Sequence, residues 1–117
     1  MIRRLPIAAA LAAGLVATAA FAHHGWGDYD AAKIFTIEAP VETAQPGNPH
    51  VTVTVKHAGK TWLAVLAPPS RMTTRGLPPE NLKPGVAVKL EGYPKRGGEP
   101  EMRAERITVA GKTVELR

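Results

Sequence analysis

The sequence predicts an all-β protein, a small OB-like barrel of five to six strands with a short helical insertion between strands three and four. Gly and Pro each occur 11 times in 117 residues, which is too many for a helical bundle. Residues 50–57 alternate apolar and polar side chains, the period of a half-buried strand. A segment without that period, residues 68–84, separates three predicted strands from the later ones, and this order is typical of an OB-type barrel.

The first 22 residues have the pattern of a secretory signal peptide. A basic pair at 3–4 precedes an uncharged apolar run over 5–21, and small residues occupy the first and third positions of 20–22. We expect cleavage after residue 22, which gives a periplasmic protein that begins at His23 and has no stable membrane anchor. The alternative is a retained anchor, because a run of about 17 residues is near the lower limit for crossing a bilayer.

The mature chain divides into an N-terminal arm, residues 23–32, and a small β-barrel domain, residues 33–117. The arm is rich in Gly and acidic residues, which predicts irregular structure. β-Branched residues over 34–43 predict the first strand, with an edge position or a bulge at Pro40. A dense turn signal at 45–49 leads into the alternating second strand.

The later elements follow from composition and turn signals. Ser70 is placed to cap a short helix over 71–75, which Gly76 can end, and 78–82 predicts a second helical turn. Further strands are expected at 61–66, 86–92, 101–109 and 113–116.

The predicted core combines the valines of the second strand with apolar residues of the other strands. The set is Val51, Val53, Val55, Leu63, Val65, Val88, Leu90 and Ile107. Trp62, Met72 and Met102 are also expected to pack in the core.

Composition excludes several classes of function. The absence of cysteine excludes disulfides, thiolate metal sites and thiol nucleophiles. Without the two signal-peptide arginines, 13 of the 15 basic residues remain against 10 acidic ones, a net charge of +3 that does not indicate nucleic-acid binding. The mature chain has a single serine, Ser70, and no catalytic carboxylate pair, so no enzyme is predicted.

Histidines in the arm predict a metal site. The amine and ring of an N-terminal His23 can chelate one metal, and a further histidine completes a three-nitrogen site, a histidine brace. Such a ligand set suits Cu(II), with zinc as the competitor. The predicted metal residues are His23, His24, His50 and Asp30, the last as an oxygen ligand or a residue that orients a ring.

Two histidines compete to complete that site. His50 shares the outward Thr face of its strand, whereas His57 lies at the other end, beside the expected entry of the arm. In the opposing interpretation the His pair is merely solvated and Asn48-Pro49 is turn chemistry. Trp26, beside the pair, is expected to dock the arm or to cover a metal.

Short motifs spread over the mature chain resemble DUF6152, a family of small exported bacterial proteins of unknown function. They are Ala22-His23-His24-Gly25-Trp26 with Tyr29-Asp30, Gly47-Asn48-Pro49-His50-Val51, Leu82-Lys83-Pro84-Gly85, Glu91-Gly92-Tyr93-Pro94 and Ala104-Glu105-Arg106-Ile107. The resemblance implies a periplasmic protein without an assigned activity. It favours His50 over His57, which falls in none of these motifs.

Two functions are therefore expected. The first is a periplasmic protein that binds copper for handling or sensing. The second is a non-enzymatic OB-type interaction module for a protein or glycan partner, using the face of strands two and three near Thr54, Lys56 and Lys60.

Overall fold

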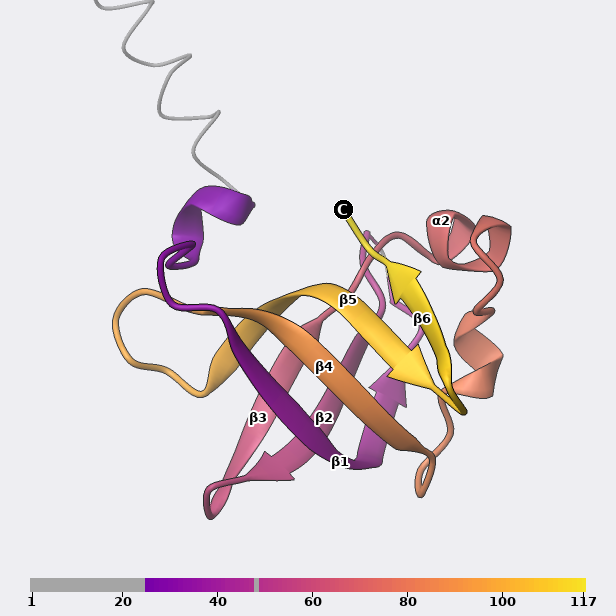
Figure 1. Cartoon of the computed structure of the whole chain (residues 1–117), viewed down its shortest axis with the longest axis horizontal. Coiled ribbons are helices and arrows are strands. Elements are labelled where there is room, and N and C mark those ends of the chain that lie inside the picture. The colour runs from indigo at the N-terminus through magenta and orange to yellow at the C-terminus, as the bar shows by residue number, and fades with distance from the viewer. Residues whose placement is uncertain (1–24, 48) are drawn as a thin grey trace, which may run out of the picture.

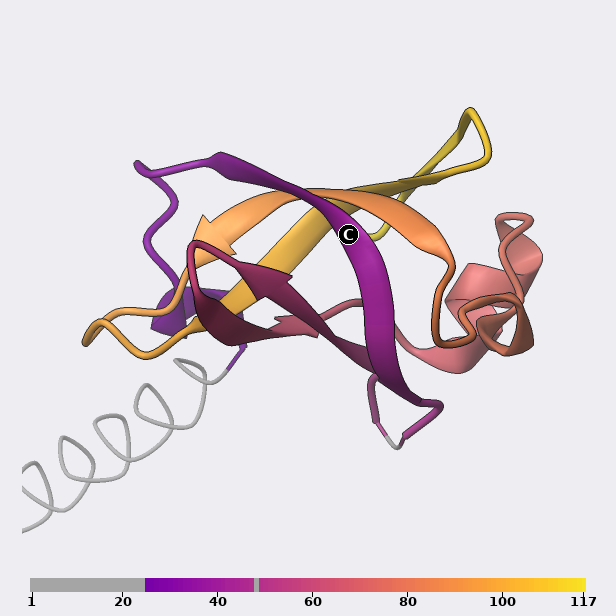
Figure 2. The same cartoon turned by 90° about the horizontal axis from the view of Figure 1, so that it is seen from below.

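The computed structural model describes residues 25–47 and 49–117, so the predicted signal peptide, His23, His24 and Asn48 lie outside the described residues. Its strands are β1 (Phe35–Gln45), β2 (Thr52–His57), β3 (Lys60–Val65), β4 (Ala87–Pro94), β5 (Glu101–Val109) and β6 (Lys112–Glu115). They form one sheet in the order β3-β2-β1-β4-β5-β6. β3 also pairs with β5, which closes the first five strands into a barrel (Figures 1 and 2). The predicted all-β, OB-like fold is confirmed.

The long strand β1 joins the two halves of the barrel. Residues 35–40 pair with β4, and residues 41–45 pair with β2. The register shifts between Val41 and Thr43, directly after Pro40, so the bulge predicted there is present. A bulge bends the strand that carries it, which lets β1 curve from one side of the barrel to the other (Figure 2).

The helical insertion consists of α2 (Pro69–Thr74) and the 3-10 helix η2 (Pro79–Asn81), between β3 and β4. Met72, Leu77 and Leu82 from this insertion are buried in the core. The prediction that Ser70 caps the helix is wrong, because α2 already begins at Pro69 and no side chain caps it. Proline suits the first position of a helix, since its φ is already helical and it has no N–H to satisfy.

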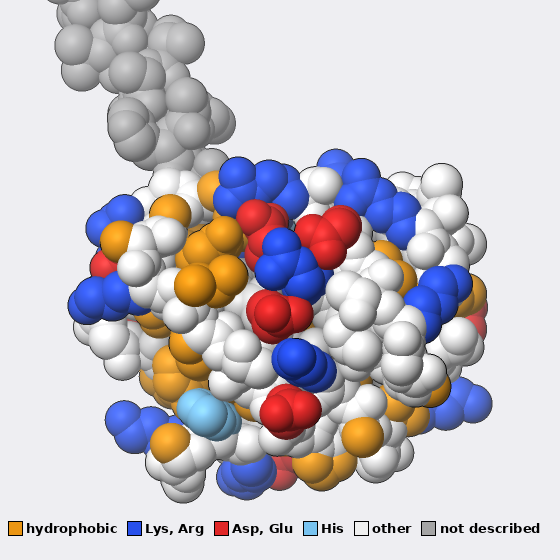
Figure 3. Space-filling view, in the orientation of Figure 1, with side chains coloured by type: hydrophobic (Ala, Val, Ile, Leu, Met, Phe, Trp, Pro, Cys, Tyr) orange, Lys and Arg blue, Asp and Glu red, His pale blue; other side chains and the backbone are white. Residues whose placement is uncertain are grey.

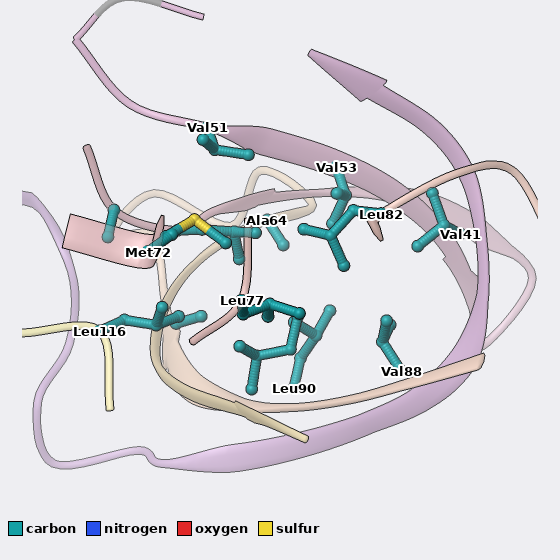
Figure 4. Close-up of a cluster of buried hydrophobic side chains, with 14 of the residues drawn as sticks. Val41, Val51, Val53, Ala64, Met72, Leu77, Leu82, Val88, Leu90 and Leu116 are labelled. Atoms are coloured by element: carbon teal, nitrogen blue, oxygen red, sulfur yellow. The ribbon is translucent and has the colours of Figure 1, made fainter. Parts of the chain in front are cut away.

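The side chains of β2 that were predicted to point into the core do so, whereas the prediction for β3 is wrong. Val51, Val53 and Val55 are buried, and Figure 4 shows the first two among the core side chains. Val53 pairs with Ala64, which is buried, so Leu63 and Val65 lie on the other face and are only partly buried. The buried hydrophobic set is Ile37, Val41, Val51, Val53, Val55, Ala64, Leu66, Ala67, Met72, Leu77, Leu82, Val88, Leu90, Met102, Ala104, Ile107, Val114 and Leu116.

The last strand, β6, extends the sheet beyond the closed barrel by pairing with the second half of β5. Two arginines of the α2 region reach this part of the chain. Arg71 Nη1 donates to the carbonyl of Leu116 at 3.1 Å, and Arg75 Nη1 donates to the carbonyl of Glu115 at 2.8 Å. These bonds fasten the helix to the C-terminal segment.

Charged side chains of both signs alternate across the outer face of β4, β5 and β6 (Figure 3). Arg106 lies 2.9 Å from Glu115 and 3.9 Å from Glu91. Because these charges compensate one another, this face is a solvated surface. In the described residues no helix is both long and apolar enough to cross a membrane.

Candidate functional site

The N-terminal arm is fastened to the hairpin between β4 and β5. Its 3-10 helix η1 (Trp26–Asp28) is followed by Tyr29, which forms a β-bridge with Lys95. The Tyr29 side chain is buried, and its hydroxyl donates to Glu101 Oε2 at 2.5 Å. Burial and this carboxylate raise the pKa of Tyr29, so the phenol stays protonated.

Two arginines contact the ring of Trp26. The guanidinium carbon of Arg103 is 4.4 Å from the ring centroid, and that of Arg117 is 4.2 Å away. The Tyr93 ring meets Trp26 edge-on at a centroid distance of 6.1 Å. A cation over an indole face is attracted by the ring quadrupole, so Trp26 docks the arm on the barrel as predicted.

Arg103 connects the arm to His50. It is the one charged side chain that is buried within residues 25–47 and 49–117, with 7% of its surface exposed. Its Nη2 lies 3.2 Å from His50 Nε2. Because a guanidinium only donates, His50 Nε2 accepts, and the neutral ring carries its proton on Nδ1. Burial lowers the pKa of Arg103, and neighbouring arginines lower it further.

The acidic residues nearest to Arg103 along β5 have other partners. Glu101 accepts from Tyr29 and lies 3.7 Å from Lys95 Nζ. Glu105 accepts from Arg117 Nε at 3.1 Å and from Tyr93 at 3.2 Å. No carboxylate among the described residues lies within 4 Å of the Arg103 guanidinium, and its Nε is buried without a hydrogen-bond partner there.

The loop before β2 places His50. Gly47 has a φ of +43°, which favours glycine, and a side chain at this position would overlap the His50 carbonyl. The pKa of His50 is lowered by burial first and then by Arg103 and Arg71. We name Trp26, His50, Arg103 and Arg117 the Arg103 cluster.

Two of the four predicted metal residues, Asp30 and His50, lie among the described residues, and each has its own partners there. No group of three or more His, Asp or Glu that could hold a metal occurs in the part of the chain that the structure describes. Asp30 Oδ1 accepts from the amide of Ala32, and its Oδ2 lies 3.9 Å from Lys33 Nζ, so it serves a local turn. His50 accepts a hydrogen bond from Arg103 at its Nε2. His23 and His24 lie outside the described residues.

His57 belongs to a different cluster. Its ring centroid lies 6.2 Å from that of Phe35 and 6.0 Å from that of Trp62. His57 was expected to lie near the start of β1, and it does. The arm, however, is connected to His50, because Trp26 contacts Arg103 and Arg103 binds His50. Trp62 is only partly buried, and its Nε1 is enclosed without a partner among the described residues.

The face of β2 and β3 that was expected to bind a partner is satisfied internally. Lys56 Nζ donates to Thr61 at 2.7 Å and lies 4.0 Å from Glu42. The hydroxyls of Thr43 and Thr54 are 2.6 Å apart. These groups are neither buried nor unpaired, so this face carries less indication of a ligand than the Arg103 cluster.

A shallow apolar groove of about 670 Å³ lies between the end of β1, α2 and η2. Pro46, Val51, Pro69, Leu82 and Pro84 line much of it. Pro46 and Val51, on either side of the turn that carries His50, line this groove. Its lining is mainly apolar, unlike the charged surroundings of Arg103.

Fold and site together define a small closed β-barrel with a docked N-terminal arm and a buried arginine that has no carboxylate partner among the described residues. The chain belongs to DUF6152, a family of unknown function, whose model matches residues 11–103. No curated protein matches the chain. The chain is similar in structure to a chain of the TiaS-tRNA(Ile2)-ATP complex, with a TM-score of 0.52 and 15% identity. The match covers 76% of this chain but only 20% of that one, so it shows the fold alone.

Sequence reasoning missed Arg103, the centre of the cluster. The signal available was a basic residue between two apolar ones, Met102 and Ala104, in a strand where all three are buried. The family motifs pointed to its neighbours, since Trp26, His50 and Tyr93 all fall in them.

Proposed function

We propose that this protein is an exported, non-enzymatic binding module of the periplasm, and that it recognises a carboxylate-bearing protein or glycan at the Arg103 cluster. The observation that carries the proposal is the buried Arg103 guanidinium without an acidic partner among the described residues. Buried charges are almost always paired, so an external anion is the natural complement.

Charge around the cluster supports the same partner chemistry. Arg71 and Arg117 act on Arg103 electrostatically, and basic side chains gather along the edge that carries the C-terminus and α2 (Figures 1 and 3). Ile34 is the one large hydrophobic side chain that is exposed among residues 25–47 and 49–117. Recognition at this surface would therefore depend on charge and on the aromatic Trp26, which is consistent with an acidic partner.

Titration with poly-L-glutamate tests this function. The protein purified from the periplasm should bind poly-L-glutamate but not poly-L-lysine, and added salt should weaken binding. Arg71→Gln and Arg117→Gln should each weaken it, whereas Lys89→Gln, which removes an exposed charge of β4, should not. Alginate, a glycan that carries carboxylates, distinguishes a glycan partner from a polypeptide. If the wild-type protein binds neither poly-L-glutamate nor alginate at low salt, the proposal is refuted.

Export makes a separate prediction about the mature terminus. Intact-mass measurement of protein recovered from the periplasm should give a chain that begins at His23. A different start would remove the N-terminal histidine from any metal site and would leave the binding-module proposal untouched.

Copper binding at the mature terminus is the second candidate, because Trp26 anchors the chain two residues after His24. At about 3.8 Å per residue, the Cα of His24 lies at most about 7.6 Å along the chain from that anchor. His23 would supply its amine and ring, and His24 or His50 a third nitrogen, with Arg103 releasing His50 in the latter case. Cu(II) or, as competitor, zinc would be the ligand.

A variant with one extra residue before His23 tests the copper site. It keeps every histidine but moves the amine out of chelating position, so calorimetry should show weaker Cu(II) binding. At free metal a hundredfold above the dissociation constant, wild type should gain about 2.7 kcal/mol of stability. Equal copper affinity with and without the extra residue would exclude the brace.

A further inference from the structure

We infer that Arg103 forms a subsite for a single carboxylate, which binds side-on to Nε and Nη2 and takes the place now held by the His50 ring. This inference rests on the proposed function and specifies its chemistry. It concerns one anchoring contact, whereas the proposed function concerns the charge of the whole cluster.

The geometry of the guanidinium supports a side-on ligand. Nε and Nη2 lie on the same side of the planar group, and their two N–H bonds match the two oxygens of a carboxylate. In the structure His50 Nε2 accepts from Nη2 at 3.2 Å, while Nε has no partner among the described residues. A single ring nitrogen satisfies one donor, whereas a carboxylate would satisfy both.

The two carboxylates nearest to Arg103 in sequence bind other residues instead of its guanidinium. Glu101 and Glu105 flank Arg103 at two residues on either side, but Tyr29 and Lys95 bind the first, and Tyr93 and Arg117 bind the second. The barrel thus holds a buried cation with both adjacent acids directed elsewhere. Such an arrangement leaves Arg103 available to an external acid.

The surroundings of the guanidinium favour a planar anion in its plane. The guanidinium carbon of Arg103 lies over the Trp26 ring, 4.4 Å from its centroid, and that of Arg117 lies 4.2 Å from the same centroid. His50, on the loop before β2, occupies one donor of Nη2. Binding of a carboxylate to this donor would require the His50 side chain to move away.

The principal test is an NMR titration of the processed protein with acetate, followed at the Arg103 Nε–H and the His50 ring nitrogens. Acetate should shift both sets of signals, whereas chloride at equal ionic strength should not. Arg103→Lys keeps the charge but loses the side-on pair of donors, so it should weaken acetate binding about tenfold, by the usual strength of a charged hydrogen bond. Arg106→Lys, at an arginine of the same strand that pairs with Glu91 and Glu115, is the matched control and should bind as wild type.

A second variant keeps the test decisive if Arg103→Lys does not fold. His50→Ala removes the competing acceptor and enlarges the position, so acetate should bind several-fold more tightly. Weaker binding to His50→Ala would overturn the idea that the carboxylate replaces this ring. Equal affinity for inorganic phosphate and acetate would overturn the assignment of a carboxylate.

The two proposals fail in different ways. If wild type binds poly-L-glutamate and Arg103→Lys binds it equally well, the cluster is a binding surface but the side-on subsite is absent. If wild type binds neither poly-L-glutamate nor acetate, both proposals are refuted.

Discussion

The guanidinium of Arg103 donates to the ring of His50 across 3.2 Å, and this bond joins the loop before β2 to strand β5. The two residues are 53 positions apart in sequence. Because the bond requires an unprotonated Nε2, it makes the charge of His50 a determinant of how this part of the barrel holds together.

The His50–Arg103 contact predicts a loss of stability at acidic pH. Burial and two arginines lower the pKa of His50 below its ordinary value of about 6.5. The folded protein therefore binds this proton less readily than the unfolded chain, so the stabilisation is present above about pH 6.5 and declines as pH falls towards the folded-state pKa. Urea unfolding at pH 7.5 and pH 5.0 measures the effect. The pH dependence should become weaker in His50→Gln and stay as in wild type in His57→Gln, and the reverse ranking would contradict this account.

Replacing Gly92 with alanine should destabilise the barrel. The β4 register shifts between Glu91 and Gly92, and a side chain at Gly92 would overlap the backbone of Arg103. Forced separation of two packed strands costs about 1–3 kcal/mol. Gly27→Ala is the matched control, because a methyl group there meets nothing within 4 Å. Thermal melting of the two variants should differ clearly, and equal melting would show that β4 and β5 adjust at no cost.

Removal of Trp26 should loosen the start of the arm, while Tyr29 still holds the arm to the β4–β5 hairpin. Trp26→Ala loses both cation–π contacts, each worth about 0.5–1 kcal/mol at an exposed site. Trp26→Phe should retain part of that stability. A double-mutant cycle with Arg117→Gln isolates one contact, and a coupling energy indistinguishable from zero would mean that the stacking adds nothing.

A charge in the barrel interior should unfold the protein. Val53 is 1% exposed, so Val53→Asp buries an unpaired carboxylate at a cost of several kcal/mol. Domains of this kind are stable by about 5–15 kcal/mol in total, so the variant should melt far below wild type or not fold. Thr54→Asp, one residue along but on the partly exposed face, should be tolerated. Similar behaviour of the two variants in circular dichroism would mean that the inward face is misassigned.

The sequence predicted elements better where the two faces of a strand differ in polarity. Valines alternate with polar residues in β2, so its inward face was identified correctly. In β3 both faces are largely apolar, so alternation could not distinguish Leu63 and Val65 from Ala64 and Leu66. Only the pairing of Val53 with Ala64 decides that face, and pairing is a property of the whole sheet.

The candidate site was predictable only in part, for a related reason. His50 and Trp26 stand in recognisable motifs, and the metal hypothesis rested on His23 at the expected N-terminus with a further histidine such as His50. Arg103 changes that interpretation, because a guanidinium at 3.2 Å makes the ring an acceptor for a cation that is already present. Strand pairing and the loop conformation bring Arg103 to His50, and a local sequence pattern contains neither.

The bonds from Arg71 and Arg75 to the C-terminal segment also protect the sheet from growing. An outermost strand such as β6 presents backbone carbonyls and amides that can recruit a strand from another copy of the chain. Two arginine side chains instead occupy the carbonyls of Glu115 and Leu116. We expect this edge to be open before α2 docks, so association between copies would compete with docking at that stage. Loss of these arginine bonds should therefore favour aggregation.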